Sequence, residues 1–187
     1  MEKKMTPKER LAAVDEFREP DVMPVFPRIM AQAIYAKGWM LSDISTQTEM
    51  DGEKMAQAFL DSVKEVGYDW PFGAYMDHGF GVPALGGTLK IPSKFGISVS
   101  IDEPVLKGKG DWPAIKKKLP IDPMKDGRCR GALQSIKIVS KAIGNTHPIF
   151  AAYYTGVTAA NILFRKVEAL TLEMAEDPEF VDELCRA

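Results

Sequence analysis

The stretch RCRGALQSIKIVSKAIGNTHPIFAAYY, residues 128–154, decides the fold. In residues 128–143 the apolar side chains of Leu133, Ile136 and Val139 recur at helical spacing, with lysines on the opposite face, which predicts an amphipathic helix. A Gly-Asn pair ends this helix, and residues 148–154 form a nearly continuous apolar run, typical of a strand buried on both faces. A helix followed by such a strand indicates a parallel sheet of the α/β class.

The same alternation of strands and helices extends toward the N-terminus. Residues 22–26 and 68–76 are short apolar or aromatic runs that are predicted to be strands, and Pro24 restricts the first to a strand start or a sheet edge. Residues 51–66 repeat apolar side chains at helical spacing, and Gly67 is expected to end that helix. A doubly wound sheet and a (β/α)8 barrel both fit this pattern, so the residues alone leave the two architectures open.

Two local signals complete the expected elements. Thr6, Pro7 and Glu9 are the residue types of an N-cap, a first helical position and a capping box, so a helix is expected to begin at Pro7. Residues 88–91 and 96–101 alternate apolar and polar side chains with period two, which predicts an antiparallel hairpin inserted among the α/β elements.

Composition and charge narrow the class of protein. The 187 residues include 24 Lys and Arg against 26 Asp and Glu, a formal net charge of -2, which gives no electrostatic footprint for nucleic acid. No apolar run approaches the about 20 residues that a membrane span requires, and the N-terminus lacks a signal-peptide core, so a cytoplasmic protein is expected. The cysteines, Cys129 and Cys185, are too few and too isolated for a disulfide framework or a metal site.

Asp77 and His78 are the main candidates for chemistry. They directly follow the predicted strand 68–76, at the end where parallel α/β folds carry their active sites. A carboxylate among the aromatic residues of this stretch would lose part of its hydration and could hold a cationic or N–H-bearing group of a substrate. The alternative is that Asp77 caps a turn through its own backbone, and the sequence leaves these two roles equally open.

Four more residues are candidates to contact a substrate. Tyr153 and Tyr154 close the predicted strand 148–154 at its C-terminal end, and Arg28 and Gln32 lie just past the first strand. Aromatic residues at such positions are as often part of a core, so the two tyrosines keep both interpretations.

Two other features are interpreted as structural. His147 precedes the last predicted strand, at the end of the sheet where such folds place residues that serve stability. Gly79, Gly81 and Ala84 formally match a dinucleotide fingerprint, but strands rather than a helix are expected after them. Because that fingerprint needs a helix N-terminus to receive the pyrophosphate, a nucleotide site is not inferred.

The order of these signals resembles the uroporphyrinogen decarboxylase superfamily. The resemblance covers nearly the whole chain and rests on residues 6–10 and 19–21 before the first strand, on Asp77 followed by residues 84–86, on the hairpin, and on residues 177–179 opening the last helix. The superfamily includes the decarboxylases of haem biosynthesis and corrinoid-dependent methyltransferases. Its fold is a (β/α)8 barrel with the active site at the C-terminal mouth, which agrees with the position expected for Asp77.

Transferring the family's residues to this sequence separates the two branches. In the decarboxylases two arginines after the first strand clamp the acidic substrate, and their positions fall here on Ile29 and Ala33. A decarboxylase tyrosine aligns with Leu163, and only Asp77 matches a decarboxylase residue, the aspartate that contacts pyrrole N–H groups. Because isoleucine and alanine cannot bind carboxylates, the resemblance favours a methyltransferase with Asp77 as its catalytic residue. Decarboxylation of a tetrapyrrole is the alternative.

The resemblance also implies how much of a domain is present. A (β/α)8 barrel typically takes about 250 residues, so residues 1–187 are expected to form the N-terminal portion of one barrel domain, a partial TIM barrel. Its two open sheet edges imply completion by a C-terminal half or by a second copy. In the methyltransferases the C-terminal half holds the zinc that activates the acceptor thiol. This half is therefore expected to bind no cofactor itself, with zinc and a corrinoid confined to the complete protein or complex.

The partner implied by the resemblance is a corrinoid protein or a tetrapyrrole substrate, with neither nucleic acid nor a membrane involved. The chain alone is expected to lack a complete active site. A non-catalytic half-barrel that folds or acts only with another subunit is therefore a further hypothesis, from a different functional class.

Overall fold

The computed structural model describes residues 4–75 and 79–187, and helices dominate its regular structure. The α-helices are α1 (Pro7–Asp15), α2 (Ala31–Ala36), α3 (Gly52–Val66), α4 (Val82–Leu85), α5 (Trp112–Lys116), α6 (Gly127–Ile143), α7 (Gly156–Leu163), α8 (Val167–Glu176) and α9 (Pro178–Arg186). The short 3-10 helices are η1 (Leu41–Asp43) and η2 (Lys109–Asp111), and the strands are β1 (Thr88–Lys90) and β2 (Ser100–Glu103).

The helix boundaries follow local signals. The hydroxyl of Thr6 accepts a hydrogen bond from the Glu9 N–H at 3.2 Å, and the Glu9 carboxylate accepts one from the Thr6 N–H at 2.7 Å. This capping box satisfies two N–H groups that the first turn of α1 leaves without helical partners. At the end of α3, Gly67 takes the left-handed conformation with φ 76°, which residues with a Cβ rarely adopt. Both predicted boundaries are confirmed.

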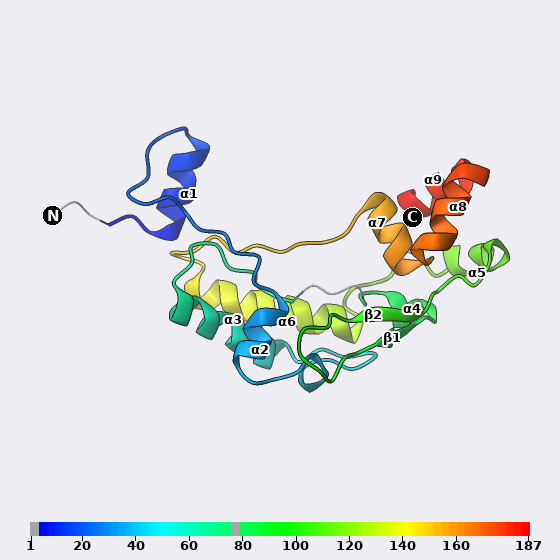
Figure 1. Cartoon of the computed structure of the whole chain (residues 1–187), viewed down its shortest axis with the longest axis horizontal. Helices are drawn as coiled ribbons and strands as arrows, with labels where there is room; N and C mark the ends of the chain where they lie inside the picture. Colours follow the sequence, from blue (N-terminus) through cyan, green and yellow to red (C-terminus); the bar gives the residue numbers. More distant parts are fainter. Residues whose placement is uncertain (1–3, 76–78) are drawn as a thin grey trace.

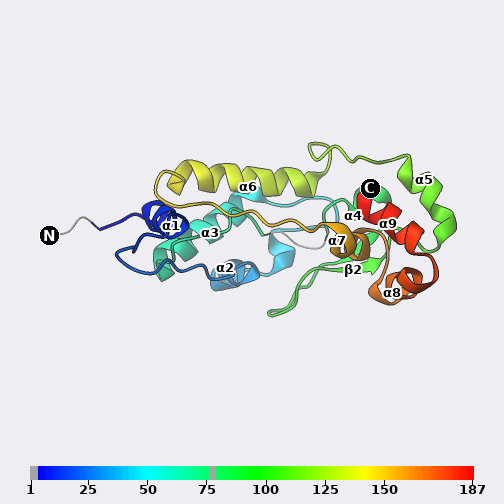
Figure 2. The same cartoon turned by 90° about the horizontal axis from the view of Figure 1, so that it is seen from above.

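α3 and α6 lie side by side along the middle of the molecule (Figures 1 and 2). Their backbones approach closely because two glycines stand at the contact. A Cβ on Gly131 would lie 2.1 Å from the Met50 carbonyl oxygen, and a Cβ on Gly52 would lie 2.3 Å from the Gly131 carbonyl oxygen. Around this contact Phe59 and Val139 are fully buried and belong to one core cluster.

The buried face of α6 differs from the predicted one at Leu133. This side chain is 46% exposed, whereas Gly131, Ser135 and Val139, spaced four residues apart, lie on the buried face. The buried hydroxyl of Ser135 also donates a hydrogen bond to the Gly73 carbonyl oxygen at 2.7 Å. Close backbone contact and a polar tether, rather than apolar size alone, therefore decide which face of α6 is covered.

Of the predicted strands, residues 22–26, 68–75 and 148–154 lie side by side in chain order, but they are irregular. The Asp69 N–H donates to the Val25 carbonyl oxygen at 3.1 Å, the Phe150 N–H donates to the Pro71 carbonyl oxygen at 2.9 Å, and the Gly73 N–H donates to the Phe150 carbonyl oxygen at 2.9 Å. Among the described residues of these segments, regular strand pairing is limited to an isolated parallel bridge between Phe72 and Phe150. We call residues 22–26, 68–75 and 148–154 the extended layer.

Prolines explain why the segments of the extended layer do not pair over a longer ladder of backbone hydrogen bonds. Pro24, Pro71 and Pro148 each lack the N–H group that a continuous ladder needs. Aromatic packing supplements the few hydrogen bonds, since the ring centroids of Phe26 and Trp70 are 4.8 Å apart and those of Phe72 and Phe150 are 4.9 Å apart. The α/β class is confirmed, with extended segments in place of the expected strands. The prediction that residues 148–154 are buried on both faces is wrong, because Ala151 and Tyr153 are exposed and the other residues of this segment are half-buried.

The predicted hairpin is confirmed, with its second strand beginning at Ser100 and ending at Glu103 instead of spanning residues 96–101. β1 pairs antiparallel with β2, with Leu89 opposite Ile101 and a register irregularity next to Thr88. The alternation that predicted the hairpin holds on β1, where Leu89 is buried and Lys90 is exposed. The hairpin packs near α4, at the same end of the molecule as α5.

The molecule is elongated (Figure 1). α1 lies at one end, α7, α8 and α9 cluster at the other near α5, and residues 148–154 run between the two ends above α6. Figure 2 shows the same arrangement from above, with α6 and α2 on opposite sides of this segment. Among the described residues, no helix is long and apolar enough to cross a membrane.

Candidate functional site at the upper end of the extended layer

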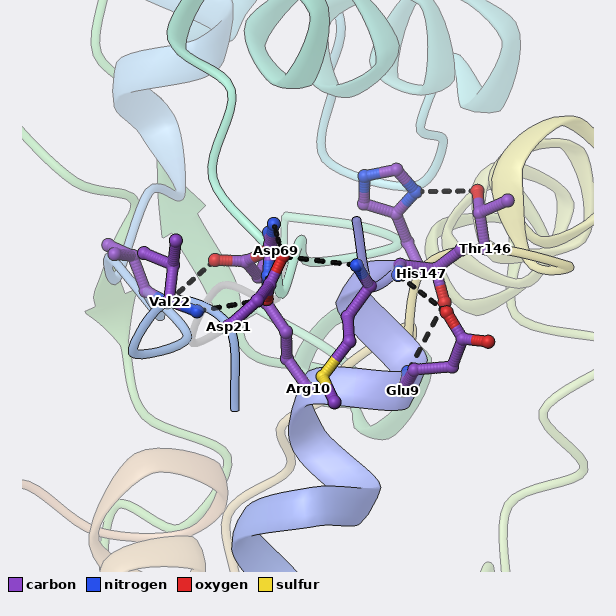
Figure 3. A network of polar contacts seen from close by, with 10 residues as sticks. Glu9, Arg10, Asp21, Val22, Asp69, Thr146 and His147 are labelled. Atoms are coloured by element: carbon purple, nitrogen blue, oxygen red, sulfur yellow. Dashed lines mark hydrogen bonds and ion pairs between the residues drawn. The ribbon is translucent and has the colours of Figure 1, made fainter. Parts of the chain in front are cut away.

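The extended layer has two ends with different polar chemistry. We call the N-terminal ends of its segments the lower end and their C-terminal ends the upper end. At the lower end, Nη1 of Arg10 lies 2.5 Å from the Asp69 carboxylate and Nε of Arg10 lies 2.7 Å from the Asp21 carboxylate (Figure 3). Asp69 also accepts a hydrogen bond from the Val25 N–H at 2.8 Å. One guanidinium thus fastens α1 to the first two segments of the layer.

The protonation of this lower network is set by the same contacts. The hydrogen bond from Arg10 is the main cause that lowers the pKa of Asp21 to about 2, with smaller contributions from the N–H groups of Met5 and Val22. The hydrogen bonds to Asp21 and Asp69 raise the pKa of Arg10 above its already high value. Arg10 and Asp21 are therefore both charged at neutral pH.

His147 lies beside this network, at the start of the third segment. Its Nδ1 is 2.9 Å from the Thr146 hydroxyl (Figure 3), and the carbonyl oxygen of Thr146 accepts a hydrogen bond from the Lys8 N–H at 3.0 Å. Burial lowers the pKa of His147, and the charge of Asp69 partly opposes this shift. These contacts link α1 to the third segment, so the lower end is a structural junction, in keeping with the interpretation of His147 from the sequence.

The upper end receives the N-terminus of α6. Because α6 precedes residues 148–154 and runs back along them, its first turn lies near the C-terminal end of that segment (Figure 1). The buried Asp126 is the N-cap of α6: one carboxylate oxygen accepts a hydrogen bond from the Cys129 N–H at 2.9 Å, and the other accepts one from the Gly81 N–H at 3.3 Å. Asp126 therefore joins α6 to the glycine-containing segment 79–81.

Arg128 places a second charged group in this first turn. Its side chain is fully buried and donates hydrogen bonds to the Ser45 hydroxyl at 2.7 Å and to the Thr46 carbonyl oxygen. A charge removed from water must be held by hydrogen bonds, and these contacts fix the loop before α3 against α6. The upper end thus combines a buried carboxylate at the N-cap of α6 with a buried guanidinium two residues further along the chain.

Sequence reasoning gave neither Asp126 nor Arg128 a role. The available signal was the capping preference of an aspartate three residues before Cys129, which would have moved the helix start from Arg128 to Gly127. The partner of Asp126 at Gly81 lies 45 residues away, and the partner of Arg128 at Ser45 lies 83 residues away. No local sequence pattern relates residues that lie this far apart in the chain.

The predicted site residues have different outcomes. Asp77 and His78 lie outside the described residues. Tyr153 is 62% exposed at the upper end, and the pKa of its hydroxyl is raised, first by partial burial and then by the nearby charges of Cys129 and Asp126. Tyr154 is half-buried.

The two candidates after the first segment are both exposed. Arg28 lies at the surface, and the side-chain oxygen of Gln32 accepts a hydrogen bond from the Met30 N–H at 3.0 Å. That bond lies within the first turn of α2, so it gives Gln32 a local role in starting this helix. The two positions of the decarboxylase arginines are covered: Ala33 is 1% exposed and Ile29 is half-buried.

The described residues do not fit a zinc ion. No group of three His, Cys, Asp or Glu side chains that could hold a metal occurs in residues 4–75 and 79–187. Cys129 and Cys185 are half-buried and lie in different helices, α6 and α9. No step of the chemistry is therefore routed through zinc on this part of the chain.

Comparison with known proteins identifies the family and the fold. The family model described as Uroporphyrinogen decarboxylase (URO-D) matches residues 6–187. No curated protein sequence gives a significant match. Among solved structures, a methyltransferase from Methanosarcina mazei is similar, with a TM-score of 0.76 and 21% sequence identity over 97% of this chain and 52% of that chain.

This chain therefore spans about half the length of that methyltransferase. At this level of identity the likeness shows a shared fold. The family match extends from the capping box of α1 to the last residue of the chain, across both ends of the extended layer. The chain belongs to the uroporphyrinogen decarboxylase (URO-D) family.

Proposed function

We propose that this chain supplies the N-terminal half of a (β/α)8-barrel methyltransferase, which moves a methyl group from a corrinoid protein to a thiol or a similar acceptor. The observation that carries the proposal is the pair of positions at which the decarboxylases have arginines. Ala33 is buried in the core and Ile29 is half-buried, so neither position presents a cation to an acidic porphyrinogen. The likeness of the fold to a methyltransferase supports the same branch.

The state of the extended layer supports a half-barrel. Along the third segment Tyr153 is 62% exposed, and along the first segment Met23 is 70% and Val25 is 54% exposed. The N–H and the carbonyl oxygen of Phe150 both bond to the second segment, at Pro71 and Gly73, on one side of the third segment. Apolar side chains and strand edges left open to water favour pairing with further strands. The proposed partner is a C-terminal half or a second copy that supplies them.

The proposed chemistry assigns distinct roles to the residues of this half. Asp77 orients the substrate or the corrinoid partner through hydrogen bonds. Tyr153 is neutral at physiological pH, since partial burial raises its pKa further above the ordinary value of 10.0, so its hydroxyl can donate a hydrogen bond at the mouth of the barrel. Zinc, where the complete protein holds it, would activate the acceptor thiol as a thiolate, with ligands from the other half.

Methyl transfer from methylcobalamin to coenzyme M tests the proposal. The chain is assayed alone and as its purified native assembly, with corrinoid absorbance and the methylated thiol as readouts. Asp77→Asn and Tyr153→Phe are expected to lower the rate, whereas Tyr35→Phe, which removes a hydroxyl bonded to Ile97 in the hairpin, serves as the matched control.

Two other outcomes would redirect the assignment. Turnover of uroporphyrinogen without methyl transfer would overturn the proposal in favour of the decarboxylase. Inactivity with both substrates, together with a concentration-dependent dimer in sedimentation, would instead favour a non-catalytic half-barrel.

A further inference from the structure

Two long helices in the structure begin with an aspartate N-cap, and the two caps differ in what else they hold. Asp51 is exposed, and its side chain accepts a hydrogen bond from the Lys54 N–H at 3.0 Å at the start of α3. Asp126 is buried and serves both the Cys129 N–H of its own helix and the Gly81 N–H of a distant segment. The second bond does not contribute to starting α6, so it needs another explanation.

We propose that Asp126 is a positioning residue that holds the glycine-containing segment 79–81 in place at the upper end of the extended layer, beside Tyr153. The inference rests on the proposed function for its catalytic meaning, because the upper end is the proposed site of methyl transfer. The tether itself consists of one carboxylate and the two backbone N–H groups that donate to it, so it can be tested separately from catalysis.

Segment 79–81 is buried, but two of its three residues are glycines, which have no side chain to fix the backbone. Gly81 has φ 79°, a left-handed conformation that favours glycine, and a Cβ there would lie 3.0 Å from Cδ1 of Ile121. Gly81 is itself the N-cap of α4, and it has no side chain with which to cap a helix whose four residues are too few to be stable by themselves. Buried Phe80 packs into the core, but packing fixes a backbone less sharply than a directional hydrogen bond.

The two-sided contact also requires a carboxylate rather than an amide. Each oxygen of Asp126 accepts one N–H, and an asparagine offers one acceptor oxygen and an NH2 group that can only donate. Asp126→Asn can therefore keep the helix cap or the tether, but not both. Its charge also contributes to the raised pKa of Tyr153, which links the carboxylate to that hydroxyl through space.

Amide hydrogen exchange tests the tether in the whole chain. In Asp126→Ala the exchange rate of the Gly81 amide is expected to rise by about tenfold or more, since a buried hydrogen bond is lost. In Asp51→Ala, which removes a comparable helix cap, the Gly81 rate is expected to stay at the wild-type value. An unchanged Gly81 rate in Asp126→Ala would overturn the proposal.

A second readout separates positioning from stability. With tyrosine labelled at the ring carbon that bears the hydroxyl, the titration of Tyr153 is followed by NMR and assigned with Tyr153→Phe. Asp126→Asn is expected to lower the pKa of Tyr153, and Asp51→Ala is expected to leave it unchanged. Equal titration in both variants would contradict a place for Asp126 at the upper end.

The activity arm links the tether to catalysis. In the methylcobalamin assay, Asp126→Ala is expected to lose at least tenfold in kcat/KM, with Asp51→Ala close to wild type at matched thermal stability. A full loss of activity in both variants would mean that Asp126 acts as a helix cap alone, and it would overturn the proposal. Absence of methyl transfer in the wild type would reject the proposed function, while the Gly81 exchange and the Tyr153 titration would still decide the tether.

Discussion

Arg10 and Asp69 form an ion pair across 59 residues of sequence, with Nη1 of the arginine 2.5 Å from a carboxylate oxygen of the aspartate. The two side chains are only 10% and 7% exposed. Because the same guanidinium also binds Asp21, this pair connects helix α1 to the lower end of the extended layer. Its removal therefore affects more of the molecule than one salt bridge at the surface would.

Arg10→Ala is expected to lower the free energy of unfolding by about 3 kcal/mol, because it leaves the buried Asp69 carboxylate without its counter-charge. Urea unfolding followed by circular dichroism measures the change. Arg18→Ala is the matched control, since Arg18 pairs with Glu16 where both side chains are more than half exposed, and a change of less than about 1 kcal/mol is expected there. Equal effects of the two substitutions would contradict a structural role for the buried pair.

Asp21 is expected to make the stability of the chain depend on acid pH. Its pKa in the folded state is about 2, lowered mainly by the hydrogen bond from Arg10, against 3.8 as the ordinary value. Because the folded-state pKa is the lower one, this contribution is complete above about pH 4 and is lost as the pH falls toward about 2. Unfolding free energies measured between pH 5 and pH 2 should therefore decline less steeply in Asp21→Asn than in the wild type. A wild-type slope in the variant would show that other carboxylates carry the acid dependence.

The sequence revealed contacts between residues that are close together in the chain, and it did not reveal contacts between residues that are far apart in it. The capping box of Thr6 and Glu9 joins residues three apart, so the residue types alone revealed it. The bonds from Arg10 to Asp69 and from Gly81 to Asp126 join residues that no periodicity relates. Both contacts depend on how the segments pack, which local patterns do not encode.

The extended layer shows a second limit. Apolar runs correctly located three segments that lie side by side, but they did not predict how far each is buried, since Val25 is 54% and Tyr153 is 62% exposed. The same runs contain Pro24, Pro71 and Pro148, and each proline removes a donor from the ladder, so an isolated bridge at Phe72 and Phe150 replaces regular strands. At the candidate site, sequence reasoning placed Tyr153 at the upper end but had no signal for the buried Arg128.

His147 is expected to titrate below its ordinary pKa of 6.5, chiefly because the folded chain removes water from the ring. The unfolded chain then binds more protons than the folded one in this range, so stability rises as the pH increases and is complete above about pH 6.5. The ring titration can be followed by proton NMR in His78→Gln, where His147 is the remaining histidine. A pKa at or above 6.5 would mean that the charge of Asp69 outweighs the effect of burial.

Gly131 is expected to tolerate no side chain, because α3 and α6 meet through backbone at this residue. A Cβ there would lie 2.1 Å from the Met50 carbonyl oxygen, and backbone atoms cannot move aside as the end of a flexible side chain can. Gly131→Ala should therefore force the two helices apart and lower the free energy of unfolding by at least about 2 kcal/mol. Gly108→Ala is the control, since a Cβ there meets nothing within 4 Å, and its effect should stay within about 0.5 kcal/mol. Equal midpoints of urea unfolding for the two variants would show that the helices can separate at little cost.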